Sequence, residues 1–151
     1  MQTVKVNNPL YLGRIAQRIQ EYYRRINPVG ITYETLYAYL CNIVQYGQQA
    51  MEFYIALDDE SQPIGFAVFT IMPLPYVGMV HFDHIYTWGK HSGVTNALVD
   101  EAEKFADKHN ARLMDLTFAN PAVTRLFKRL IQKRGNLTVI ETERENFIVR
   151  K

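Results

Sequence analysis

Apolar residues recur every three or four positions in the first third of the chain, which is the spacing of a helix that buries one side. Asn8-Pro9 begins the first of these segments, because Asn8 suits a helix cap and Pro9 suits the first helical turn. Thr32 can cap a second segment, which Gly47 can end. The pattern therefore predicts one helix over 9–26 and another between Thr32 and Gly47.

After residue 50 the apolar pattern changes to that of strands. Two of them, 51–57 and 64–71, are joined by a turn at 58–63 and indicate a hairpin. The other expected strands are 77–87, 113–118, 136–140 and 147–150, with a further short one left open at 3–6, and the later helices are 93–109 and 120–134.

The order of these elements is ααβββαβαββ. The strand–helix–strand segment 77–118 implies one parallel pair of strands, joined by a right-handed crossover. No linker, internal repeat or low-complexity tract interrupts the chain. We therefore predict an α+β fold in a single domain, 1–151, whose mixed and mostly antiparallel central sheet has helices on both faces and one parallel β-α-β crossover.

Composition narrows the classes of function. The 151 residues carry a formal net charge of +2, which argues against nucleic acid as the partner. Cys41 is the single cysteine, so a disulfide framework is excluded and a cytoplasmic setting fits. No apolar run has the length of a signal peptide or of a membrane span, so we expect no membrane association. One cysteine and four scattered histidines predict no metal site.

The junction between the strand 77–87 and the helix 93–109 carries the clearest chemical signal. Its turn offers a cation at Lys90, a hydroxyl at Ser92 and, at Gly93, a backbone that a phosphate can approach closely. The helix that starts there directs backbone N–H groups and the positive end of its dipole toward the turn. These features predict a phosphate site, although the same residues also suit a capped turn without a ligand. Neither a P-loop nor a G-x-G-x-x-G motif is present.

Two short patterns resemble those of a known family. Lys90-x-x-Gly93-x-Thr95 stands in the place of the family's Arg/Gln-x-x-Gly-x-Gly/Ala, and Asn120-x-x-Val123-x-x-Leu126-Phe127-x-Arg129 has the spacing of its Asn-x-x-Ala-x-x-Leu-Tyr-x-Lys. Together with the order of the elements, these patterns make essentially the whole chain similar to the GNAT superfamily of acyl-CoA-dependent N-acetyltransferases.

The resemblance implies that the chain binds acetyl-CoA as co-substrate and transfers the acetyl group to a primary amine by direct attack. Backbone N–H groups of the strand 77–87 would then hold the oxyanion. The cofactor-binding residues that it implies are Ile85, Tyr86, Lys90, His91, Ser92, Gly93, Val94, Thr95, Asn120 and Phe127.

Three of these positions depart from the family pattern. Lys90 keeps a positive charge but lacks the planar fork of arginine. Thr95 adds a β-branched side chain where glycine or alanine is usual. Phe127 stands at the tyrosine that, in many members, protonates the departing CoA thiolate, and phenylalanine has no proton to donate. Another group or water must then do this, or the chain lacks activity.

Acetyl transfer to an amine requires a base, because the amine must lose a proton. Asp83 is our first candidate, since the family often carries a carboxylate on this strand, and His84 and His81 follow. Strand alternation places His81 and Asp83 on one face and His84 on the other. Each of them could instead be a hydrogen-bonded strand residue without a catalytic role.

A second hypothesis is a GNAT-fold protein without catalysis that serves as a structural or binding subunit of a larger assembly, for example a viral particle. The three departures motivate it, as do the tyrosine-rich helices at 9–26 and between Thr32 and Gly47, which could dock a protein partner or form the wall of an acceptor pocket. A third hypothesis is nucleic-acid binding through the basic segment 121–135, whose charges otherwise form a solvated face opposite Val123, Leu126, Leu130 and Ile131. The acceptor and the oligomeric state are left open.

Overall fold

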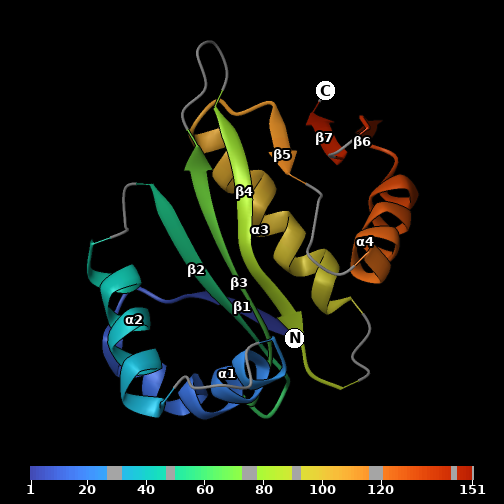
Figure 1. Ribbon diagram of the computed structural model, residues 1–151. Helices are drawn as coiled ribbons and strands as arrows, with labels where there is room; N and C mark the ends of the chain where they lie inside the picture. The colour runs from blue at the N-terminus through green and yellow to red at the C-terminus, as the bar shows by residue number, and fades with distance from the viewer. Residues whose placement is uncertain are drawn as a thin grey trace. The chain divides into compact units, whose positions relative to one another are not determined.

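The computed structural model describes residues 1–26, 32–46, 50–72, 78–89, 93–115, 121–143 and 146–150. Its helical segments are the 3-10 turn η1 (Pro9–Tyr11) and the helices α1 (Leu12–Ile26), α2 (Tyr33–Tyr46), α3 (Val94–Lys108) and α4 (Pro121–Arg134) (Figure 1). Its strands are β1 (Gln2–Lys5), β2 (Met51–Leu57), β3 (Pro63–Met72), β4 (Met79–Thr87), β5 (Leu113–Asp115), β6 (Leu137–Glu141) and β7 (Asn146–Arg150). No helix in these described ranges is long and apolar enough to cross a membrane.

The two predicted helix caps are confirmed. The Asn8 side chain accepts a hydrogen bond from the backbone N–H of Leu10 at 3.0 Å, and the proline after Asn8 opens η1 before α1 begins. The Thr32 hydroxyl accepts one from the N–H of Thr35 at 3.2 Å at the start of α2. The expected stop of α2 at Gly47 lies outside the described residues.

Seven strands form one mixed sheet in the order β1-β2-β3-β4-β5-β7-β6. β1, the segment left open in the sequence, pairs antiparallel with β2, and β7 pairs antiparallel with both β5 and β6. β4 and β5 make the expected parallel pair, in which Met79 faces Leu113 and Val80 faces Met114. The predicted α+β class, with its single parallel crossover, is therefore confirmed.

The chain divides into two compact units, and the boundaries between them fall inside β3, β4 and α3. The first unit comprises 1–68 and 84–98, and the second comprises 69–83 and 99–151. The prediction of a single domain over 1–151 stays a prediction.

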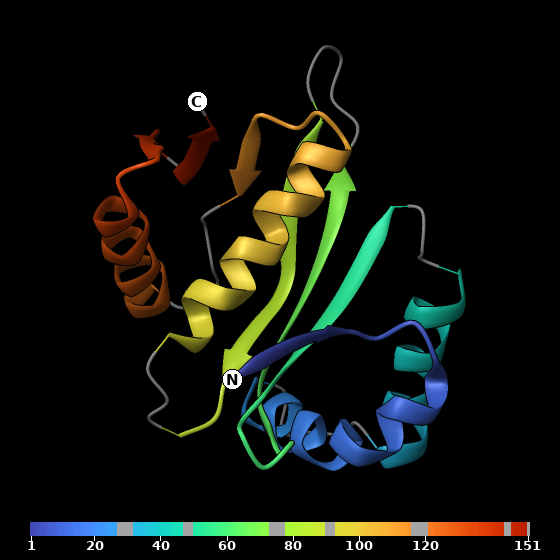
Figure 2. The same ribbon diagram turned by 180° about the vertical axis from the view of Figure 1, so that it is seen from behind.

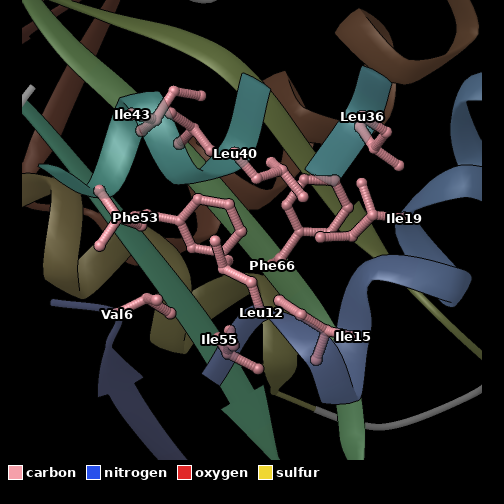
Figure 3. Packing of buried hydrophobic residues seen from close by; sticks show 12 residues of the cluster. Val6, Leu12, Ile15, Ile19, Leu36, Leu40, Ile43, Phe53, Ile55 and Phe66 are labelled. Atoms are coloured by element: carbon pink, nitrogen blue, oxygen red, sulfur yellow. The ribbon is translucent and has the colours of Figure 1, made fainter. Parts of the chain in front are cut away.

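In the first unit, α1 and α2 pack their apolar sides on one face of β2 and β3. Figure 3 shows Leu12 and Ile15 of α1, Leu40 of α2, and the stacked rings of Phe53 and Phe66 meeting in one cluster. These side chains are nearly or fully buried. The spacing of apolar residues predicted in the first helix thus matches the side that packs on the sheet.

In the second unit, aromatic rings form the core. The ring of Phe69 in β3 packs against Phe82 of β4, with centroids 6.0 Å apart, and against Phe105 of α3 at 5.2 Å. Figure 2 shows α3 running beside the strands that carry these rings. In the first unit, Phe66 of β3 belongs to the cluster that α1 and α2 cover.

The predicted apolar face of α4 is confirmed only in part, since Ile131 is buried and Leu130 half-buried as expected, but two other members of that face are not. Leu126 is 64% exposed and Val123 is also exposed, whereas Phe127 and Ile131 are the buried residues of this helix. The ring of Phe127 packs edge-on against Phe82, with centroids 5.5 Å apart. Burying an aromatic ring removes more apolar surface from water than burying valine, and this contact sets which side of α4 faces inward.

Candidate functional site

The turn that leads from β4 into α3 belongs to the first unit. Gly93 has a φ of +81°, a conformation that favours glycine, and a Cβ placed there would meet, within the described ranges, the Met1 Cε atom at 3.7 Å. Its carbonyl accepts the N–H of Ala97 at 3.0 Å, so Gly93 caps α3. Val94 is buried and Thr95 half-buried. The predicted ligands Lys90, His91 and Ser92 lie outside the described residues.

Gly65 in β3 is a site residue that sequence reasoning missed. A Cβ on Gly65 would lie 2.8 Å from the Cγ1 atom of Val94 and 3.0 Å from the carbonyl oxygen of Tyr86. The glycine therefore lets the first turn of α3 and the backbone of β4 approach β3 closely. An isolated glycine inside a strand pattern is a known sign of such an approach, and it could have pointed to this position.

A polar cluster in the second unit contains Asp83, the first candidate for the base. Its Oδ2 atom accepts a hydrogen bond from the Thr70 hydroxyl of β3, and its Oδ1 atom lies 3.6 Å from Nε2 of His81. The other ring nitrogen of His81, Nδ1, lies 2.7 Å from Oδ2 of Asp115 in β5. Side chains from three neighbouring strands thus form one chain of contacts. The sequence indicated His81 and Asp83, but not Thr70 or Asp115.

Strand alternation is expected to put His84, the second candidate, on the face of β4 opposite Asp83, but the contacts do not follow that alternation, because the partner of His84, Phe66, and the partner of Asp83, Thr70, have the same parity in β3. The His84 ring packs near Phe66, with centroids 6.4 Å apart, in the first unit. Within the described part of the chain, no group of three or more histidine, cysteine or acidic side chains could hold a metal ion.

The remaining predicted residues of β4 are Ile85 and Tyr86. Tyr86 makes an edge contact with Trp88 at 5.6 Å, and the guanidinium of Arg18 in α1 lies 5.7 Å from the Trp88 ring. Ile85 is half-buried. On α2, the charge of Cys41, and then its hydrogen bond, raise the pKa of Tyr37 above the usual tyrosine range. This side of the first unit is the one on which we expected an acceptor wall.

The second predicted pattern is only partly described. Asn120 lies outside the described residues, and Phe127 is 4% exposed against Phe82. Two cations of the basic helix α4 have acidic partners: Lys128 pairs with Glu141, and Arg134 pairs with acidic residues of α3. The solvated basic face is therefore smaller than the sequence indicates.

Comparison with known proteins finds similar solved structures but no match by sequence. No protein-family model matches the chain, and no curated protein matches it by sequence. Solved structures do match. An acetyltransferase of the GNAT family from Staphylococcus aureus Mu50 is similar over 99% of this chain and 98% of its own, with 9% identity and a TM-score of 0.65.

Two further solved structures agree. A predicted acetyltransferase with acetyl-CoA from Clostridium acetobutylicum covers 95% of this chain and 92% of its own, at 14% identity and a TM-score of 0.68. A ribosomal-protein-alanine N-acetyltransferase from Brucella melitensis biovar Abortus 2308 covers 86% and 91%, at 18% identity and a TM-score of 0.64. Identities this low speak for the fold rather than for an activity. The chain has the fold of the GNAT acetyltransferases.

Proposed function

We propose that this chain is an acetyl-CoA-dependent N-acetyltransferase that transfers the acetyl group to a primary amine by direct attack. The observation that carries the proposal is Asp83, a half-buried carboxylate on β4 that is oriented by Thr70 within the GNAT fold. The names of similar structures add support, since one was determined with acetyl-CoA and another acts on a ribosomal-protein alanine.

The turn at Gly93 is the proposed binding site for the diphosphate of the co-substrate. Among the residues that the structure describes, a Cβ at Gly93 would touch one flexible side chain, that of Met1. The turn also lies at the positive end of the α3 dipole, which favours an anion. Acetyl-CoA would supply a thioester whose carbonyl carbon the amine attacks. The exposed glycine and the dipole together fit the anionic part of this molecule.

Asp83 is the proposed base. As the amine nitrogen forms its bond to the acetyl carbon, its proton passes to the carboxylate, and the oxyanion is held by backbone N–H groups of β4. Collapse of the intermediate then breaks the carbon–sulfur bond. The departing thiolate takes its proton from water, because Phe127 stands where a tyrosine would donate one.

Two measurements test the proposal together. Calorimetric titration with acetyl-CoA and CoA should give micromolar binding, and a panel of primary amines should include one that releases free thiol only when protein, acetyl-CoA and amine are all present. Binding without thiol release from any amine would refute catalysis. Absence of binding would remove acetyl-CoA from the proposal altogether.

A non-catalytic subunit with this fold is the second candidate, and the burial of Phe127 favours it. The side chain at the position of the family's acid lies in the core against Phe82 and is 4% exposed. A protein that no longer catalyses the reaction would keep a phenylalanine here for packing, because it needs no proton donor at this position. The same titration separates the two candidates, because this one predicts no amine-dependent thiol release.

A further inference from the structure

The imidazole of His81 lies between two carboxylates that come from different strands. Nδ1 is 2.7 Å from Asp115 Oδ2, within hydrogen-bonding distance, and Nε2 is 3.6 Å from Asp83 Oδ1, just beyond it. The proposed reaction uses only Asp83. That reaction gives no role to His81 or to Asp115, although His81 lies beside Asp83 and Asp115 contacts His81.

The chemistry of the groups assigns the proton on the ring. An ionised carboxylate only accepts hydrogen bonds, so the contact with Asp115 requires that Nδ1 carries the hydrogen. In the neutral ring Nε2 is then an acceptor, and it faces Asp83. Thr70 fixes the carboxylate from the opposite oxygen, since its hydroxyl donates to Asp83 Oδ2. Asp115 thus holds the orientation of the His81 ring, and Thr70 holds that of the Asp83 carboxylate.

We infer that His81 carries the proton onward from Asp83 and that Asp115 is a positioning residue that holds His81 in the required tautomer. The inference rests on the proposed function. The amine proton first binds Asp83, and it then passes to Nε2 of His81, directly after a small approach or through one water. Asp83 returns to its carboxylate form, and the ring becomes an imidazolium that still donates from Nδ1 to Asp115.

Solvent exposure gives the direction of this transfer. The side chain of Asp115 is 17% exposed, that of Asp83 26% and that of His81 35%. The ring is thus the member of the chain with the freest access to water, to which it can release the proton after each turnover. A carboxylate that orients a histidine while the ring moves protons is a known arrangement in other enzymes.

Nitrogen NMR of the histidine rings tests the positioning role directly. At pH 8, the wild-type ring of His81, assigned by its loss in His81→Gln, should carry its hydrogen on Nδ1. Asp115→Asn should abolish this preference, and Asp115→Glu should restore most of it. Glu60→Gln, which removes a carboxylate from the exposed β2–β3 turn, is the matched control and should change nothing. A ring with hydrogen on Nε2, or with both nitrogens protonated at this pH, would overturn the inference.

Kinetics tests the proton transfer. Asp115→Asn and His81→Gln should each lower kcat about tenfold or more, as loss of a proton-transfer partner does, with the KM for acetyl-CoA unchanged. Asp115→Glu should recover part of the loss. If the wild type releases thiol and both variants match it, the relay is refuted and the transferase stands. If the wild type releases no thiol with any amine, the proposed function fails and the relay fails with it.

Discussion

At the scale of single residues, the candidate chemistry of this chain depends on side chains that neighbouring strands bring together. Asp83 is held by Thr70 through one oxygen and faces His81 with the other. Neither partner is adjacent to Asp83 in sequence. A carboxylate with one oxygen fixed by a hydrogen bond keeps a preferred orientation, and a general base needs that orientation before the substrate arrives.

Asp83→Asn should lower kcat for amine acetylation by about 100-fold or more, because asparagine accepts the Thr70 hydrogen bond but cannot accept a proton. The affinity for acetyl-CoA should stay within twofold, since Asp83 does not belong to the turn at Gly93. A thiol-release assay measures kcat and calorimetry measures the affinity for acetyl-CoA. Glu60→Gln is the control for the lost charge. A variant with wild-type kcat would move the base to another residue.

Gly65→Ala should destabilise the protein by about 1–3 kcal/mol, the usual cost of overpacking. The added Cβ would meet Val94 Cγ1 at 2.8 Å and the carbonyl oxygen of Tyr86 at 3.0 Å. The Val94 side chain can rotate away from the new Cβ, but the carbonyl oxygen of Tyr86 can move away only if the backbone of β4 moves. Urea unfolding measures the change.

Gly13→Ala is the matched control for this substitution. No described atom lies within 4 Å of a Cβ at Gly13 in α1, and alanine is the better helix former, so this variant should be stabilised by about 0.5–1 kcal/mol. Opposite signs at the two glycines are the expected pattern. An equally stable Gly65→Ala would mean that α3 does not approach β3 as closely as described.

At the scale of elements, the junction of β4 and α3 combines a cap, a left-handed glycine and a buried first residue. Gly93 accepts from Ala97, and Val94 packs beside Gly65. The result is a helix whose start is fixed against β3 and is preceded by the exposed Gly93. Such an element can bind an anion without moving.

Gly93→Trp should abolish binding of acetyl-CoA, because the indole would fill the approach to the turn. Any side chain at a φ of +81° also adds strain, of about 1–2 kcal/mol. Two controls separate strain from obstruction: Gly93→Ala at the same position, and Gly135→Ala, where φ is +74° and no atom of the described part of the chain lies within 4 Å. Calorimetry should show binding in both controls. Unchanged affinity in Gly93→Trp would put the co-substrate elsewhere.

At the scale of the whole molecule, β3 and β4 run from one compact unit into the other. A strand cannot lose its order in one half without affecting the backbone of the other half. This continuity agrees with the prediction of a single domain, which the division into units leaves open.

We expect one cooperative unfolding transition for the chain. Trp88, the only tryptophan, reports on the first unit by fluorescence, and far-ultraviolet circular dichroism reports on both units. Their urea midpoints should coincide. A fluorescence transition separated from the dichroism transition would show that the units unfold independently, and the chain would then not be one domain in the thermodynamic sense.

Local patterns in the chain were enough to predict most of its helices and strands, their caps at Asn8 and Thr32, and the one parallel strand pair. Those properties depend on residues close together in the chain, where spacing and backbone preference decide. Local patterns did not predict that Phe127 rather than Leu126 is buried, that Val94 packs against Gly65, or that Thr70 and Asp115 contact Asp83 and His81. Each of these is a contact between residues far apart in sequence, and packing in three dimensions selects among the many pairings that a periodic pattern allows.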